Sequence, residues 1–284
     1  MERHQPGNTK VRDSWDSRPG EEYSLPTTTY RRLGRQYSRW MYRLRAGVFQ
    51  RVAKGLPLRW PEARVLDVGS GSGFYVDQWH RLGVPKVAGA DLTEVTVRQL
   101  EQRFPGDDFV QFDLCKPLPA YVTRLSAPRS AESEARVAVP GFDAVSAMDV
   151  LSRIVDATQY EQALRNIASL LKPGGWLLWS DYFLRRRTER VSHQPGRPLR
   201  ESEAAVRAAG FDIVDRRPMF VVMNYPADAQ SKLARWGWTA MAAGAALAEP
   251  LVWIVGAILY PVERQLTRVV KESPSTEIMV CRRA

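Results

Sequence analysis

The stretch VLDVGSGSGFY, residues 65–75, decides the fold of this 284-residue chain. Four residues typical of a buried strand lead into a glycine-rich turn, and a helical pattern of apolar residues begins at Phe74. Glycine tolerates positive φ angles and has no Cβ, so a ligand can lie against the bare backbone of the turn, at a helix N-terminus. The stretch therefore predicts a ligand-binding strand–turn–helix unit.

The spacing of the glycines bears on the ligand. The loop reads G-x-G-x-G rather than the G-x-G-x-x-G of dinucleotide-binding folds, and Asp67 stands two residues before the first glycine. S-adenosylmethionine (SAM) carries an ammonium group, a carboxylate and a sulfonium, but no pyrophosphate. An acidic side chain beside the loop suits such a cationic amino-acid end better than it suits two phosphates.

Outward from this unit, short apolar runs alternate with helical patterns, which is typical of an α/β fold with a parallel sheet. The expected helices cover residues 30–56, 74–82, 93–103, 156–171 and 200–209. The expected strands cover residues 64–68, 86–90, 109–112, 142–148, 176–180, 211–217 and 276–282. Residues 172–175, Lys-Pro-Gly-Gly, are expected to end the fourth of these helices.

Three segments interrupt the alternation. Residues 1–28 are expected to form a disordered polar leader, residues 116–140 a surface insertion, and residues 219–275 a helical insertion before the last strand. Within the last, only residues 251–260 are uncharged and strongly apolar, which is too short to cross a bilayer as a helix. A hairpin packed on the core or on a second subunit, an interfacial helix flanked by tryptophans and arginines, and a transmembrane segment all stay open.

Composition limits the partners and the compartment. The net charge of +10 favours anionic partners, among them nucleic acid, phosphate-bearing metabolites and membrane surfaces. Cys115 and Cys281 lie far apart, which predicts neither a disulfide framework nor a metal site. We therefore expect a cytoplasmic protein, with a location at the membrane periphery left open.

Two further acids follow predicted strands. Asp91 ends the second strand, where acids of such folds accept hydrogen bonds from ribose hydroxyls, and Asp113 ends the third. Ligands of open α/β sheets bind at the carboxyl ends of the strands, near the point where the strand order reverses. The three acids Asp67, Asp91 and Asp113 therefore indicate one adenosyl-ligand site.

These motifs, together with FDAVSAMDVL and LLKPGGWLLWSDYF, resemble those of class I SAM-dependent methyltransferases, in particular the small-molecule branch similar to methyltransferase types 11 and 12. The resemblance covers residues 60–217 of a domain spanning residues 29–284. It implies a Rossmann-like, doubly wound, seven-stranded and mostly parallel sheet with an N-terminal helix and an antiparallel last strand at residues 276–282. It also implies SAM contacts from Asp67, Gly69, Ser70, Gly71, Gly73, Phe74, Asp91, Leu92, Asp113, Leu114 and Met148.

Methyl transfer from a sulfonium requires mainly correct positioning, but a hydroxyl acceptor also needs a base. The candidate bases are His193, Asp149 and Asp181; Arg153 stands where many relatives place a histidine. The arginines of the loop after the fifth strand would suit a phosphorylated or nucleotide-linked acceptor; they are Arg185, Arg186, Arg187, Arg190 and Arg197. Tyr37 and Tyr42 of the first helix are candidates for a lid over SAM.

The predicted function is O- or N-methylation of a small-molecule or carbohydrate-like acceptor, anionic or sugar-linked. Residues 31–54 contain eight basic residues and no acid, so an RNA or DNA methyltransferase is an alternative, although the chain lacks the motifs for methylating bases. A non-catalytic SAM- or nucleotide-binding module is another. Membrane contact through residues 236–261 and a homodimer are both left open.

Overall fold

The computed structural model describes residues 34–125, 141–185, 197–245 and 249–284. Its centre is one seven-stranded sheet of order β3-β2-β1-β4-β5-β7-β6, in which only β7 runs antiparallel to its neighbours. This confirms the predicted fold class, including the antiparallel last strand. The strands are β1 Val65–Val68, β2 Val87–Asp91, β3 Asp108–Gln111, β4 Phe142–Met148, β5 Leu171–Asp181, β6 Phe211–Pro218 and β7 Glu277–Arg283.

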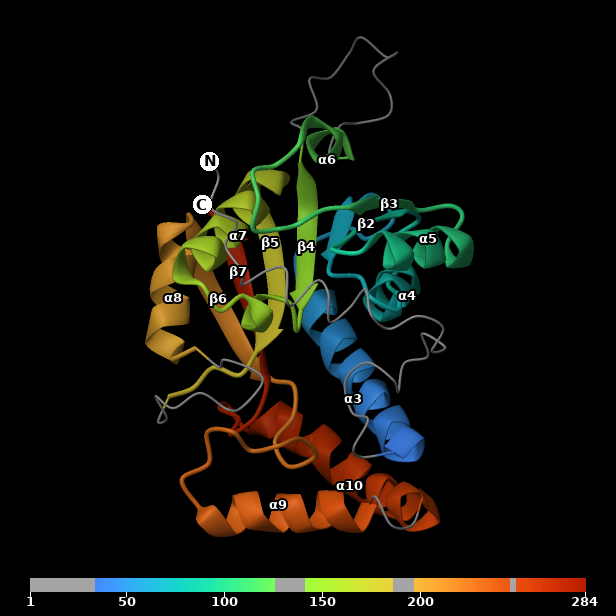
Figure 1. Ribbon diagram of the computed structural model, residues 1–284, viewed down its shortest axis with the longest axis vertical. Coiled ribbons are helices and arrows are strands. Elements are labelled where there is room, and N and C mark those ends of the chain that lie inside the picture. Colours follow the sequence, from blue (N-terminus) through green and yellow to red (C-terminus); the bar gives the residue numbers. More distant parts are fainter. Residues whose placement is uncertain (1–33, 126–140, 186–196, 246–248) are drawn as a thin grey trace, which may run out of the picture.

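Helices cover both faces of the sheet (Figure 1), because each face of a central parallel strand is apolar and must be buried. On one face lie α3 Gly34–Lys54, α4 Phe74–Arg81, α5 Glu94–Arg103 and α10 Glu249–Val269. On the other lie α6 Ala120–Leu125, α7 Ala157–Leu170 and α8 Leu199–Ala208. A further helix, α9 Lys232–Ala245, precedes α10.

Two local predictions are corrected. Residues 172–175 belong to β5, which begins at Leu171: Leu171 pairs with Phe142 and Trp176 with Ala144, so the residues between bulge out of the ladder. The segment 116–140 is not wholly irregular, since α6 forms within it. Residues 126–140, the leader 1–28 and residues 29–33 lie outside the described part of the chain.

The insertion before the last strand is helical, as predicted, and α10 packs along α3. Trp40 lies between the two helices, with ring centroids 5.2 Å from Tyr260 and 5.9 Å from Trp253. A side chain at Gly256 would collide with Trp40, so the close approach requires glycine there. Among the described residues, no helix is long and apolar enough to cross a membrane.

Candidate functional site

A cavity opens at the carboxyl ends of β1–β4, where the strand order reverses between β1 and β4. Its walls come from the glycine loop, the ends of these four strands and α3. The residues that line the cavity include Tyr42, Arg45, Gly69, Ser70, Gly71, Phe74, Tyr75, Asp91, Asp113, Met148, Asp149 and Arg153. The topology therefore brings segments that are far apart in the sequence to one site.

One glycine of the loop faces the cavity, and another packs against the neighbouring helix. Gly71 lines the cavity with φ of 51°, and a Cβ placed on it would meet nothing closer than 3.8 Å. A Cβ on Gly73 would instead lie 2.4 Å from the Phe104 ring, and Gly73 has φ of 76° as the N-cap of α4. Gly71 thus leaves room for a ligand, whereas Gly73 lets the helix pack closely on its neighbours.

Asp67 lies buried beneath the loop, near the end of β1. Its Oδ1 accepts a hydrogen bond of 2.5 Å from the Ser146 hydroxyl, which in turn accepts one of 2.9 Å from the Trp79 indole. Its Oδ2 has no partner among the described residues. Burial raises the pKa of this carboxyl to about 7, against the opposing effect of the Ser146 and Ser70 hydroxyls. Such an orphaned carboxylate oxygen fits a cationic ligand group.

Asp91 and Asp113 mark the ends of β2 and β3 on the cavity wall. Asp91 accepts hydrogen bonds from the Gly71 backbone N–H (3.0 Å) and the Thr93 N–H (3.2 Å), so it ties the glycine loop to β2. Burial raises its pKa above the usual range, and these backbone donors oppose the rise. Asp113 accepts from the Cys115 N–H at 3.0 Å. Each acid therefore presents hydrogen-bond acceptors beside the cavity.

Asp149 follows β4 and has φ of 59°, in the left-handed region that non-glycine residues rarely adopt. Its carboxylate is held from two sides: Arg45 Nη1 lies 2.6 Å from Oδ2, and the Ser180 hydroxyl donates to Oδ1 at 2.8 Å. Arg45 is itself almost fully buried on α3 and donates to the Tyr75 hydroxyl at 3.1 Å. This arrangement fixes one carboxylate, with its backbone in a strained conformation, at the cavity wall.

Comparison with known proteins identifies the family. A family model described as a methyltransferase domain matches residues 37–242, which is most of the chain and includes every element around the cavity. This chain belongs to the class I SAM-dependent methyltransferases. The cofactor of this methyltransferase is accordingly SAM.

Solved structures share the fold of this methyltransferase at low identity. Magnesium protoporphyrin IX methyltransferase (ChlM) from Synechocystis PCC 6803, solved with SAM, is 14% identical, with a TM-score of 0.52 and 100% of both chains covered. The CcbJ methyltransferase from Streptomyces caelestis is 14% identical, with a TM-score of 0.51, covering 86% of this chain and 96% of that one. Among curated proteins, none matches the sequence.

The residues predicted to contact SAM are brought together. All of them line the cavity except two: Asp67, which lies beneath the loop, and Gly73, which packs on Phe104. The resemblance to class I methyltransferases implied this set, and the strand ends and the glycine loop supplied the motifs that carry the resemblance. The signal for Asp67 was its place before the first glycine, which says nothing about whether its side chain reaches the cavity.

The structure places the three candidate bases differently. Asp149 lines the cavity, and His193 lies outside the described residues. Asp181 is almost fully buried and is absent from the cavity wall; its Oδ1 accepts from the adjacent Tyr182 N–H, and Oδ2 has no partner among the described residues. Burial raises the pKa of Asp181 well above its usual range. Of the two candidates that the structure describes, only Asp149 therefore lines the cavity.

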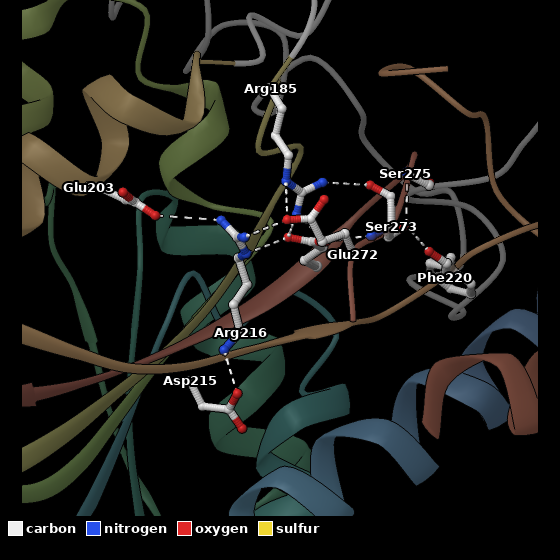
Figure 2. Close-up of polar contacts among 9 residues, drawn as sticks. Arg185, Glu203, Asp215, Arg216, Phe220, Glu272, Ser273 and Ser275 are labelled. Atoms are coloured by element: carbon white, nitrogen blue, oxygen red, sulfur yellow. Dashed lines mark hydrogen bonds and ion pairs between the residues drawn. The ribbon is translucent and has the colours of Figure 1, made fainter. Parts of the chain in front are cut away.

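Two of the arginines expected to bind an anionic acceptor serve the fold instead. Arg185 lies 2.7 Å from Glu277, and Arg216 of β6 lies 2.9 Å from the same buried carboxylate. Figure 2 shows that Arg185 and Arg216 also converge on Glu272, at 3.5 and 3.7 Å, with Ser273 beside them. Arg197 donates to the Ile154 carbonyl and stacks 4.0 Å from the Tyr160 ring. Arg186, Arg187 and Arg190 lie outside the described residues.

The sequence reasoning missed Arg45 and Tyr75. A signal for Arg45 existed, since it lies four residues after Met41 and three before Val48, on the apolar stripe of its helix. A cation on such a stripe indicates a buried partner, but the partner cannot be read from the sequence. Of the two lid candidates, Tyr42 lines the cavity, whereas Tyr37 is buried in the core and donates to the Met223 carbonyl.

Proposed function

We propose that this methyltransferase transfers the SAM methyl group to a hydroxyl or amine of a small-molecule acceptor bound between α3 and the end of β4. The observation that carries the proposal is the position of Asp149, which shares one cavity with the glycine loop, Asp91 and Asp113. The cavity is also lined by Tyr42, Arg45 and Arg153. Their aromatic and hydrogen-bonding groups suit a compact polar acceptor, such as a carbohydrate-like molecule.

The cofactor half of the cavity is assigned by chemistry. Asp67, whose Oδ2 has no partner among the described residues, would attract the ammonium group of SAM from beneath the glycine loop. Gly71 would leave room for the amino-acid part of SAM. The Asp91 carboxylate would accept from ribose hydroxyls, in exchange for its present backbone donors. Asp113 and the backbone at Leu114 would border the adenine ring.

The acceptor half needs positioning and a proton acceptor. Bound SAM supplies an electrophilic methyl group that requires no covalent enzyme intermediate. The Asp149 carboxylate would take the proton from the acceptor hydroxyl or amine, while Arg45 and Ser180 hold its orientation. Both of these partners are buried, so they limit the movement of the carboxylate and favour a fixed reacting geometry.

Two arginines of α3, Arg45 and Arg51, are engaged within the fold, which favours a small acceptor over a nucleic acid. Arg45 pairs with Asp149, and Arg51 donates to Thr267 of α10. A helix that tracked phosphates would need these guanidinium groups to face the solvent.

The cofactor assignment is tested by calorimetric titration with S-adenosylhomocysteine, SAM and NAD in parallel. We expect the first two to bind and NAD not to bind. Asp91→Ala should weaken both adenosyl ligands by about tenfold or more, because it removes charge-assisted hydrogen bonds to the ribose. Binding of NAD alone, or of no adenosyl ligand, would contradict the proposal.

The catalytic assignment needs a second variant. Once an acceptor is found by screening sugars and small alcohols or amines for S-adenosylhomocysteine release, Asp149→Asn should lower kcat by about a hundredfold or more and leave SAM binding within a few-fold. Ser180→Ala should lower kcat less, since it removes only an orienting hydrogen bond. Unchanged turnover by Asp149→Asn would exclude Asp149 as the base.

A further inference from the structure

The outward faces of α9 and α10 are apolar. On α9, Leu233 is 74% exposed and Trp236 69% exposed, and the exposed Ala240 lies one turn further along the same side. On α10, Ile258 and Val269 are each 63% exposed, on the side opposite the buried Glu263 and Thr267. A helix that covers a core normally turns such a face inward, so these two helices carry a second apolar face toward the surroundings.

This concentration is particular to the two helices. Of the twelve large hydrophobic side chains that are exposed in the described part of the chain, seven lie on α9 and α10, and these include both exposed tryptophans, Trp236 and Trp253. Exposed apolar side chains gathered on two neighbouring helices are typical of an interaction site. Figure 1 places α9 along the outer edge of the molecule, beyond α10 and remote from α5, so a flat partner can reach it.

The charges around this face have one sign. Lys232 on α9 and both Arg264 and Arg268 on α10 are exposed, and Arg235 is half-buried. Among the described side chains of the two helices, the one acid is Glu263, which is fully buried and accepts hydrogen bonds from the backbone of residues 221–223. Burial lowers the pKa of Arg51, and the positive charges of Arg268 and Arg264 are among the groups that lower it further. The rim of the apolar face therefore carries a net positive potential.

We propose that the outward face of α9 and α10 docks this methyltransferase onto an anionic lipid bilayer, with Leu233, Trp236 and Ile258 in the interface and the flanking lysine and arginines on lipid headgroups. Apolar residues with tryptophan, bordered by cations, are the composition of helices that lie in a membrane surface. A second copy of the chain fits less well, because a twofold contact through this face would bring the two positive rims together.

The test is flotation of the full chain with phospholipid vesicles. We expect binding to vesicles of phosphatidylcholine containing phosphatidylglycerol at low salt, weaker binding at high salt, and little binding to pure phosphatidylcholine. Trp236→Glu should weaken binding by about tenfold or more, because it removes a buried indole and adds a negative charge. Arg264→Glu should weaken it by roughly fivefold or more through the headgroup contacts.

Matched controls lie elsewhere on the surface. Val95 of α5 is 53% exposed and Arg81 of α4 is exposed, so Val95→Glu and Arg81→Glu make the same changes away from the proposed face. Both should bind vesicles as the unchanged chain does. Retention of S-adenosylhomocysteine binding and of the thermal midpoint in every variant shows that the fold is intact.

The proposal is overturned if the chain does not float with anionic vesicles at low salt, or if Trp236→Glu and Val95→Glu bind equally well. A chain that fails to float and sediments as a dimer, which Trp236→Glu converts to a monomer, would assign the face to a second copy instead. Loss of vesicle binding with intact S-adenosylhomocysteine binding concerns this surface alone and leaves the proposed function standing.

Discussion

The buried Asp67 carboxyl, beneath the glycine loop, makes the stability of the fold depend on pH. Its usual pKa near 4 in an unfolded chain rises to about 7 in the fold, through burial. Between these values the folded state holds the proton that the unfolded state has lost, so stability falls as the pH rises from about 4 to 7. Above that range the fold carries a buried charge whose second oxygen has no partner among the described residues.

We therefore expect Asp67→Asn to stabilise the ligand-free protein, by on the order of 2 kcal/mol more at about pH 8 than at about pH 5. The same variant should bind S-adenosylhomocysteine more weakly, since the carboxylate no longer attracts the ammonium group. Thermal unfolding at both pH values and calorimetry measure the two effects. Asp212→Asn, at an exposed position of β6, is the control; equal pH dependence in both variants would refute the prediction.

At the scale of the elements, two glycines of the loop have different roles: Gly71 leaves room for the ligand, and Gly73 allows close packing on Phe104. Gly71→Ala should fold with a loss of about 1 kcal/mol from its left-handed backbone, yet bind S-adenosylhomocysteine poorly, because the new methyl group occupies the cavity side. Gly73→Ala should cost more than about 2 kcal/mol, because it forces a methyl group against the Phe104 ring. Chemical denaturation and ligand titration of both variants compare these outcomes; similar unfolding curves would show the packing argument to be wrong.

Helix α10 contributes a carboxylate that holds the backbone after β6. Glu263 accepts from the backbone N–H groups of Val221 (2.6 Å), Val222 (3.0 Å) and Met223 (3.1 Å). Glu263→Ala leaves these donors without their acceptor, so we expect a loss of about 2 kcal/mol or more in the free energy of unfolding. Glu101→Ala, on the exposed side of α5, should change it by about 0.5 kcal/mol or less.

For the whole molecule, one buried carboxylate at the start of β7 ties the segment after β5 to β6. Glu277 pairs with Arg185 from the end of β5 and with Arg216 from β6, and it also accepts from the Ser273 N–H. Glu277→Gln removes the buried counter-charge of two largely buried guanidinium groups and leaves them the longer contacts to the more exposed Glu272, at 3.5 and 3.7 Å. We therefore expect a loss of about 2 kcal/mol in urea unfolding. The exposed pair Glu94–Arg98 offers the comparison: Glu94→Gln should cost at most about 0.5 kcal/mol.

Much of the adenosyl-ligand half of the site could be predicted because its signals are local. The strand, turn and helix of residues 65–81 follow from short-range propensity, and each acid of the set stands at the end of its own strand. Parallel strands present their carboxyl ends at one edge, so Asp91 and Asp113 meet there without any knowledge of side-chain contacts. The β5 bulge escaped prediction because its register depends on the partner strand β4.

By itself, then, the sequence determined the α/β alternation with a parallel sheet, the helical nature of the insertion and the glycine loop, since these depend on periodicity and on backbone conformations that few residues adopt. The resemblance of its motifs to a known family added the Rossmann-like strand arrangement. Only the tertiary structure decided which of the candidate acids lines the cavity. Asp149 and Asp181 are both aspartates at the carboxyl end of a strand. Asp149 pairs with Arg45 at the cavity wall, whereas Asp181 is buried. The physical reason is that ion pairs and burial join residues far apart in the chain, and no local pattern records their distance in space.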